Sequence, residues 1–218
     1  MTNFYVSAVC ATASAMLLMN ILASKCLFSY KFLAVDAGIL VSWIAFAASD
    51  AVLQIYGKRE ANRLALIGCI FGFIGGAILL FAVHIPGVWR VGNVTEEAES
   101  AINFVVGSTF FAVLASSLAA FCGMLLNNFL HHAILKRQKT TGFNDFCVAS
   151  GVSTFFSQMF ENFFFCGLIC YTFFDWTLLQ CAGAAVVGAV LESFVVFIFI
   201  PVIFFMIRKA KRKMRDGR

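Results

Sequence analysis

Six long apolar runs constrain the fold of this chain more than any other feature of its sequence. A helix needs about 20 mostly apolar residues to cross the hydrocarbon core of a bilayer. Each run reaches that length, and together they cover residues 4–24, 32–55, 64–84, 102–135, 146–174 and 178–207. We therefore expect an all-α polytopic membrane protein of about six transmembrane helices, with a single bundle over residues 1–207 and a basic tail over residues 208–218.

The composition argues against a water-soluble fold. Hydrophobic residues make up 61% of the chain and charged residues only 12%, with a mean hydropathy of +0.91. This charged fraction is about half of what a soluble domain uses to cover its surface. We expect neither an enzyme nor a cofactor, because the sequence has no Gly-rich phosphate loop, no HExxH motif and no nucleophile with an evident base.

Positive charges are distributed unevenly among the segments that connect the apolar runs. Of the 16 Lys and Arg residues, 13 lie in segments 56–63, 136–145 and 208–218, and the other three lie in the alternate connections. The positive-inside rule then predicts that both termini are cytoplasmic, which fits an even number of spans. We expect a multi-pass protein of a bacterial inner membrane, whose basic tail favours anionic lipid headgroups and requires no nucleic acid as a partner.

Polar side chains inside the apolar runs are the candidate functional residues, because an ion at mid-bilayer costs at least ~2.5–3.5 kcal/mol. In the fifth run, Glu161 and Asn162 follow Ser157 or Gln158 by three or four residues, and this spacing predicts one polar helix stripe flanked by Phe residues. Asp50 and Gln54 of the second run are likewise one turn apart. A carboxylate, amides and aromatic faces together would form a binding site for a planar heterocycle that makes hydrogen bonds.

Other residues extend this predicted substrate site. They are Asn20, Asn127 and Asn128, which add donors and acceptors within apolar runs, and Trp43, which offers a ring for stacking. Glu192, in the middle of the sixth run, is a further acidic residue that the membrane should not tolerate without a purpose. The alternative for each amide is a structural hydrogen bond between helices.

Histidine and cysteine do not predict a metal site. His131 and His132 are adjacent and close to Lys136 and Arg137, so we expect them at the bilayer edge rather than on a metal. Most of the eight cysteines fall inside apolar runs, where a thiol behaves as a small hydrophobic group. We expect these cysteines to pack in the bundle without forming disulfides.

Small residues recur at helical spacing in two runs. Gly68, Gly72 and Gly76 form a smooth stripe on one helix face, and Ala11 and Ala15 do the same in the first run. Packing within the chain is the preferred interpretation of both stripes. For Ala11 and Ala15, a docking face for a separate subunit is the alternative.

Several short motifs resemble the YhhQ/VUT family of queuosine-precursor transporters. They are NILASK at residues 20–25, Ala37-Gly38, SDAVLQIYGKREANR at 49–63, VGSTFFAVLASSLAAF at 106–121 and STFFSQMFENFFF at 153–165. The motifs occur in the family order. Each one alone is a short pattern in a biased composition, but together they are fairly specific.

The chain departs from the family pattern at four places, which makes it a divergent member by resemblance. The family has a second acid after Asp50, an arginine before the fourth-helix motif, and an aspartate in each of the fourth and fifth helices. The corresponding residues here are Gln54, Phe110 or Phe111, Asn127 and Glu161. An arginine–carboxylate pair inside the bundle is therefore missing, and Glu161 gains importance as an ionisable group.

The resemblance implies import of a 7-deazaguanine for tRNA modification, either queuine or one of its precursors, preQ0 or preQ1. Such a base fits the predicted site, because the adjacent N–H donors of its guanine-type edge can both bond to one carboxylate. A stand-alone carrier with alternating access is the main hypothesis, with a proton linked to an acidic residue left open as its energy source. The alternative is the substrate-binding subunit of an energy-coupling-factor importer, which needs an energising partner, and assembly with a second copy is also left open.

Overall fold

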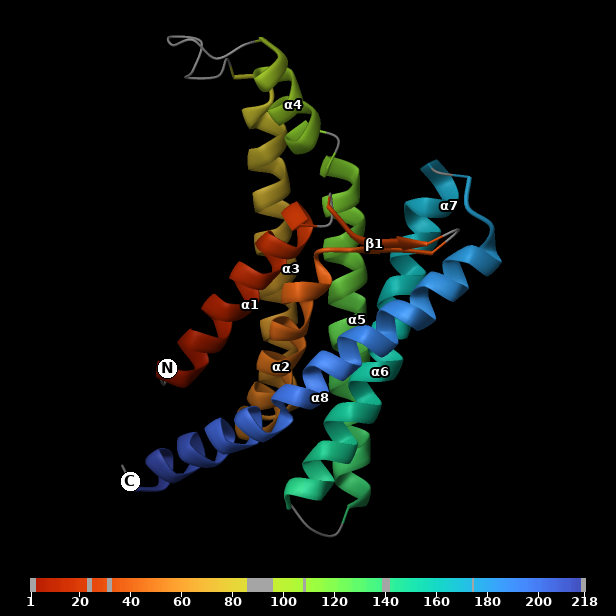
Figure 1. Ribbon diagram of the computed structural model, residues 1–218. Helices are drawn as coiled ribbons and strands as arrows, with labels where there is room; N and C mark the ends of the chain where they lie inside the picture. The colour runs from red at the N-terminus through yellow and green to blue at the C-terminus, as the bar shows by residue number, and fades with distance from the viewer. Residues whose placement is uncertain are drawn as a thin grey trace.

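The computed structural model describes residues 3–22, 25–30, 33–85, 96–107, 109–138, 142–173 and 175–216. Residues 86–95 of one predicted connection, and the cations Lys31, Arg90, Lys139 and Arg218, lie outside these ranges. The elements, in order, are α1 (Asn3–Leu22), β1 (Cys26–Tyr30), β2 (Leu33–Asp36), α2 (Ile39–Tyr56), α3 (Lys58–Ala82), α4 (Glu96–Gly107), α5 (Thr109–Arg137), α6 (Phe143–Leu168), α7 (Cys170–Phe173) and α8 (Leu178–Asp216). Figure 1 shows the long helices packed as one bundle.

The predicted all-α polytopic membrane fold is confirmed. Five helices of the described chain are long and apolar enough to cross a bilayer, namely α1, α2, α3, α5 and α8. The sixth expected span, α6, has 26 residues but is not among the five. Its apolar residues are interrupted by serine, threonine, glutamine, glutamate and asparagine, which lower its hydropathy without shortening it. The polar residues that lower the hydropathy of this helix are therefore also its most informative feature.

Two of the expected boundaries are wrong. The run predicted over residues 32–55 begins with strand β2, which pairs antiparallel with β1, and α2 starts only at Ile39. The hairpin satisfies its backbone groups by strand pairing, so a helix is not needed there. The run predicted over residues 102–135 is divided between α4 and α5.

A glycine separates the second and third helices. Gly57 has φ 89°, in the left-handed region that residues with a Cβ seldom adopt, and it lies between the last residue of α2 and the first of α3. Its N–H donates to the carbonyl of Leu53, which closes the last turn of α2. The cations of the basic segment 56–63 therefore lie in the first turns of α3, which Gly57 alone separates from α2, and not in a long loop.

Glycine also sets the distance between α3 and its neighbours. A methyl group added at Gly68 would meet Thr12 and Met16 of α1, and one added at Gly72 would meet Ser117 of α5. The stripe thus packs inside the chain, as expected. Ala15 of the other stripe is 2% exposed and packs in a cluster with residues of α2, α3 and α5, so it is not available as a docking face.

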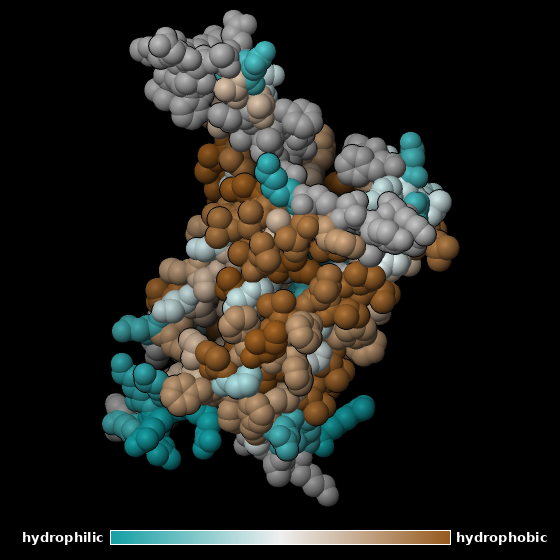
Figure 2. Space-filling view, viewed as in Figure 1, coloured by the Kyte–Doolittle hydropathy of each residue, from teal (hydrophilic) through white to brown (hydrophobic). Residues whose placement is uncertain are grey.

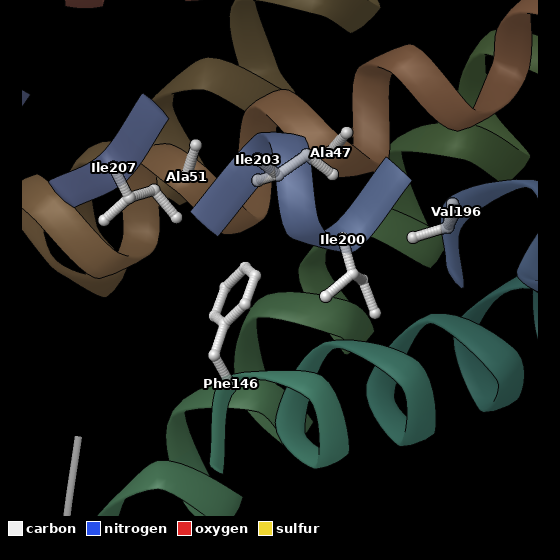
Figure 3. Packing of buried hydrophobic residues seen from close by; sticks show 7 residues of the cluster. All are labelled: Ala47, Ala51, Phe146, Val196, Ile200, Ile203 and Ile207. Atoms are coloured by element: carbon white, nitrogen blue, oxygen red, sulfur yellow. The ribbon is translucent and has the colours of Figure 1, made fainter. Parts of the chain in front are cut away.

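The largest apolar cluster joins α2, α6 and α8. Figure 3 shows its residues, Ala47, Ala51, Phe146, Val196, Ile200, Ile203 and Ile207. The four α8 residues are spaced three or four apart, so one face of that helix is buried along its length. With 39 residues, α8 is roughly 58 Å long, about twice the thickness of the hydrocarbon core. It crosses the bundle obliquely, and the predicted tail continues it as a helix to Asp216.

The basic segments gather toward one end of the bundle (Figure 1, Figure 2). Several helix ends lie toward the same end of the bundle in Figure 1. They are the N-terminal end of α1, the junction of α2 and α3, the C-terminal end of α5, the N-terminal end of α6 and the C-terminal end of α8. Figure 2 shows hydrophilic residues gathered at this end and a hydrophobic surface over the middle of the same face. The described residues of the three basic segments thus lie at one end of the molecule (Figure 1), which is the arrangement that the positive-inside rule requires.

Candidate functional site

The buried face of α6 is polar over most of its length. Its buried residues include Ser150, Ser153, Thr154, Ser157, Gln158 and Glu161. The first five are fully buried, and Glu161 is 8% exposed. The opposite face is apolar and exposed, with residues such as Val152, Phe156 and Phe160. A helix with its polar face inward is typical of a bundle that surrounds a polar site within the membrane.

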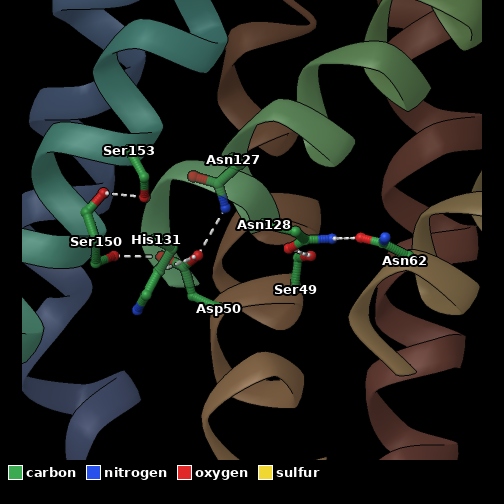
Figure 4. Close-up of polar contacts among 8 residues, drawn as sticks. All are labelled: Ser49, Asp50, Asn62, Asn127, Asn128, His131, Ser150 and Ser153. Carbon is green, nitrogen blue, oxygen red and sulfur yellow. Dashed lines mark hydrogen bonds and ion pairs between the residues drawn. The ribbon is translucent and has the colours of Figure 1, made fainter. Parts of the chain in front are cut away.

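The N-terminal part of this face, at Ser150, contacts Asp50 of α2. The carboxylate of Asp50 accepts a hydrogen bond from Asn127 Nδ2 at 2.7 Å and one from Ser150 Oγ, and its Oδ1 lies 2.9 Å from His131 Nδ1. All four side chains are fully buried. Figure 4 shows them converging from α2, α5 and α6. We call Asp50, Asn127, His131 and Ser150 the Asp50 cluster.

Asn128, next to Asn127 on α5, makes its hydrogen bonds on another face of this helix. Its carbonyl oxygen accepts a hydrogen bond from Ser49 Oγ at 2.8 Å, and its amide nitrogen donates to Asn62 Oδ1 at 3.1 Å (Figure 4). Both ends of this buried amide are therefore used in joining α5 to α2 and α3. Asn128 is predicted from the sequence as a substrate contact, and in the structure both of its polar atoms bond to other helices.

A second acidic cluster lies further along α6. Glu192 of α8 is 7% exposed, and its carboxylate accepts hydrogen bonds from Ser42 Oγ at 2.7 Å and from Asn162 Nδ2 at 2.9 Å. We call Ser42, Asn162 and Glu192 the Glu192 cluster. Asn162 therefore bonds to α8, although the sequence placed it on one stripe with Glu161.

Glu161 lies against α5 at a glycine. A methyl group added to Gly123 would be 3.0 Å from Glu161 Oε2 and 3.1 Å from its Cβ, so only glycine leaves room for the side chain as it stands. Gly123, Asn127 and His131 are each four residues apart on α5 and so share a face. The same helix face thus meets Glu161 and, one and two turns on, the Asp50 cluster.

Polar atoms between the two clusters lack partners among the described residues. They include both amide atoms of Gln158 and the hydroxyls of Thr154 and Ser157, and all three side chains are fully buried. A buried polar group without a hydrogen bond costs about 1–3 kcal/mol. Along α6, Gln158 lies between Ser150 of one cluster and Asn162 of the other. This middle segment can therefore supply hydrogen bonds to a polar molecule at low desolvation cost.

Three other predicted residues lie outside this segment. Gln54 accepts a hydrogen bond from Lys211 at 3.4 Å, and the amide of Asn20 donates to Ser117 at 3.4 Å. The ring of Trp43 stacks on that of Phe199, with centroids 4.2 Å apart and planes 7° apart. One face of this indole is therefore already covered by α8.

Sequence reasoning missed the position of His131. It was expected at the bilayer edge, but its side chain is fully buried and contacts Asp50. The four-residue spacing from Asn127 would have placed both on one helix face. The partners Ser42, Ser49, Asn62 and Ser150 were also missed, because a single serine or asparagine in an apolar run gives no signal of its own. In the part of the chain that the structure describes, no group of three or more His, Cys, Asp or Glu residues could hold a metal ion.

One known protein family matches most of this bundle. A family whose description reads "putative vitamin uptake transporter" matches residues 36–206, more than three quarters of the 218 residues. The matched region includes all residues of the Asp50 and Glu192 clusters and the middle of α6. No curated protein and no solved structure matches the chain. On the family match, this multi-pass membrane protein belongs to the family of putative vitamin uptake transporters.

Proposed function

We propose that this chain is a carrier that imports a 7-deazaguanine precursor of queuosine across the bacterial inner membrane for use in tRNA modification. The substrate would be queuine, preQ0 or preQ1. The observation that supports the proposal most directly is the fully buried amide of Gln158, one turn from the carboxylate of Glu161. Neither polar atom of this amide has a hydrogen-bond partner among the described residues. A guanine-type edge presents adjacent donors and an acceptor, which match a carboxylate and an amide.

The two acidic clusters suggest how such a carrier would change access. The Asp50 cluster joins α6 to α2 and α5, whereas the Glu192 cluster joins α6 to α2 and α8. Ser150 and Asn162 are 12 residues apart, so the clusters are separated by about 18 Å along α6. Opening one cluster while the other stays closed would expose the middle segment to one side of the membrane at a time.

This proposal includes substrate contacts by Glu161, Gln158 and Asn127. The carbonyl of Asn127 has no hydrogen-bond partner among the described residues. The partners Asn162, Asn128 and Asn20 would hold the helices around the site. The chain would act as a carrier and not as an enzyme, in contact with membrane lipids, whether as a monomer or as a homo-oligomer. The competing hypothesis is a substrate-binding subunit that needs a separate energising partner.

Uptake by cells tests the proposal. A bacterium that lacks queuosine-precursor transport and energy-coupling-factor modules would carry only this gene, and labelled queuine, preQ0 and preQ1 would be supplied in turn. Uptake of one of them by this strain, and not by a strain with an empty vector, is the expected result. Uptake only after co-expression of an ATPase and its membrane partner would favour the binding subunit. Absence of uptake by the strain with this gene alone and by the strain with the co-expressed ATPase and membrane partner would refute this substrate class.

A further inference from the structure

The proposed function gives the buried imidazole of His131 no role of its own. Its Nδ1 lies 2.9 Å from Asp50 Oδ1, and its Nε2 has no hydrogen-bond partner among the described residues. A carboxylate oxygen accepts hydrogen bonds, so Nδ1 carries the hydrogen of this contact. In the neutral ring, Nε2 then holds a free lone pair that can take up a proton.

We infer that Asp50 and His131 form a proton-binding site that couples proton entry to substrate import. The inference rests on the proposed function for the identity of the substrate, but not for the site itself. A proton from outside would bind Nε2 of His131 to give an imidazolium beside the Asp50 carboxylate. The same proton would leave that nitrogen to the cytoplasm after the change of access, and no covalent bond of the substrate is broken.

Charge balance favours this order of events. With neutral His131, the carboxylate of Asp50 is a net negative charge in the membrane interior, whereas the protonated pair has no net charge. A net charge in the bilayer is expensive, and a paired one less so. The hydrogen bonds from Asn127 and Ser150 to Asp50 join three helices, so rearrangement of α6 must disturb this carboxylate (Figure 4). The protonated pair is therefore the state in which such movement is easier.

Other ionisable groups of the surrounding helices have different contacts. In α1, Tyr5 contacts the ring of Tyr56, and in α3, Lys58 lies over the ring of Phe129 and Glu60 bonds to Arg63. In α6, Asp145 accepts a hydrogen bond from the N–H of Gly142. In α8, Arg208 lies over the ring of Phe204 and Lys211 donates to Gln54. His132 is adjacent on α5 and points to another face. Among the described residues, Asp50 of α2 is the charged group within hydrogen-bond distance of His131.

The site is also connected to the middle of α6. Ser150 bonds to Asp50, and one turn further Thr154 is fully buried with an unpartnered hydroxyl, followed by Ser157 and Gln158. On α5, Gly123 faces Glu161, and Asn127 lies between Gly123 and His131. Both helices therefore carry a polar face from the proton site to the proposed substrate site. Binding at one end can alter the hydrogen bonds at the other without a large movement.

Reconstitution of the full chain in liposomes tests the coupling. The membrane potential is clamped with potassium and valinomycin, the outside is made one pH unit more acid, and labelled preQ0 is added. With one proton carried per substrate, the wild type should concentrate preQ0 about tenfold. In the absence of a gradient, added preQ0 should acidify the lumen, which trapped pyranine reports. The His131→Gln variant should only equilibrate preQ0, at whatever rate it retains, without acidification.

Two controls make the outcome decisive. His132→Gln alters the adjacent histidine on another helix face and should concentrate preQ0 as the wild type does. Gradient-driven accumulation by His131→Gln equal to that of the wild type would overturn the inference. If His131→Gln cannot be reconstituted, the wild type alone decides. Uptake of preQ0 by the wild type without entry of protons would also overturn the inference.

A measurement without substrate separates this inference from the proposed function. Nitrogen NMR of histidine-labelled protein in lipid nanodiscs follows each imidazole between about pH 5 and 8, the range in which the charge of an ordinary histidine changes. A titrating signal that disappears in His131→Gln and persists in His132→Gln is expected. A His131 signal that stays in one protonation state would overturn the proton site. If no deazaguanine is transported but the His131 signal changes with pH, the proposed substrate is refuted and the proton site is supported.

Discussion

Replacing Gln158 with Met should stabilise the empty protein and weaken substrate binding at the same time. The Gln158 side chain is fully buried, and neither its Nε2 nor its Oε1 has a partner among the described residues. Met has a similar length and shape but no strong donor or acceptor, so it can occupy the same space without an unpaired polar group. The substitution therefore removes a desolvation cost from the empty state and two hydrogen bonds from the bound state.

The magnitudes follow from this environment. One unpaired buried polar atom costs about 1–3 kcal/mol, so removing the amide should raise the free energy of unfolding by at least about 1 kcal/mol. For a chain of 150–250 residues, 1 kcal/mol corresponds to a change in Tm of about 2–4 °C. In the complex, the substrate would be left with unpaired groups, and its affinity should fall at least tenfold.

Asn128→Leu is the matched control. This amide is also fully buried, but it bonds to Ser49 at 2.8 Å and to Asn62 at 3.1 Å. Its replacement leaves those partners unpaired, so the Tm should fall by a similar amount. The two substitutions remove the same functional group and should change the Tm in opposite directions.

Both variants would be purified in detergent and unfolded by heat, with tryptophan fluorescence as the signal. Binding of labelled queuine, preQ0 and preQ1 would be measured on the same samples. A Gln158→Met protein that is less stable than the wild type and still binds substrate normally would refute the reasoning. Gln158 would then be a structural amide like Asn128.

Other predictions concern the charge, the packing and the topology of the bundle. Glu161→Gln should fold but lose charge-assisted hydrogen bonds worth about 1.5–3 kcal/mol, so substrate affinity should fall roughly 10- to 150-fold in the same binding assay. Normal binding and transport by a stable variant would make Glu161 structural. Gly72→Ala places a methyl 3.0 Å from Ser117 Cβ and should lower the Tm, whereas Gly151→Ala meets nothing within 4 Å and should not. Fluorescent protein fused after Arg218 should fluoresce and alkaline phosphatase fused there should be inactive, because the basic tail is expected in the cytoplasm; active phosphatase would refute that topology.

Helical periodicity made much of the fold and part of the site predictable. Apolar runs of sufficient length identified the membrane helices, and three- or four-residue spacing placed Gln158 and Glu161 on one face of α6. The buried polar face of that helix agrees with this expectation. The hairpin β1–β2 could not be predicted in this way, because a short apolar segment suits either a strand or a helix.

Partners between helices were beyond the reach of the sequence. Asp50 and His131 are 81 residues apart, and their contact depends on how α2 and α5 pack. Neighbouring residues on a helix also point in directions about 100° apart. Asn127 and Asn128 therefore bond to Asp50 and Ser49, respectively, although in the sequence they are equivalent amides. Only the packed bundle distinguishes a structural amide from one available to a substrate.

This distinction also gives a route to the substrate. In the structure, hydrogen bonds hold α6 at Ser150 and at Asn162. The amide of Gln158 between them is buried and has no partner among the described residues. A molecule that satisfies the amide binds the folded state and not the unfolded chain, so at 100 times its Kd it should add about 2.7 kcal/mol to the free energy of unfolding. The true substrate should therefore raise the Tm of the wild type strongly and that of Gln158→Met weakly. A compound that raises both Tm values equally binds elsewhere, and this comparison can rank deazaguanines before any transport is measured.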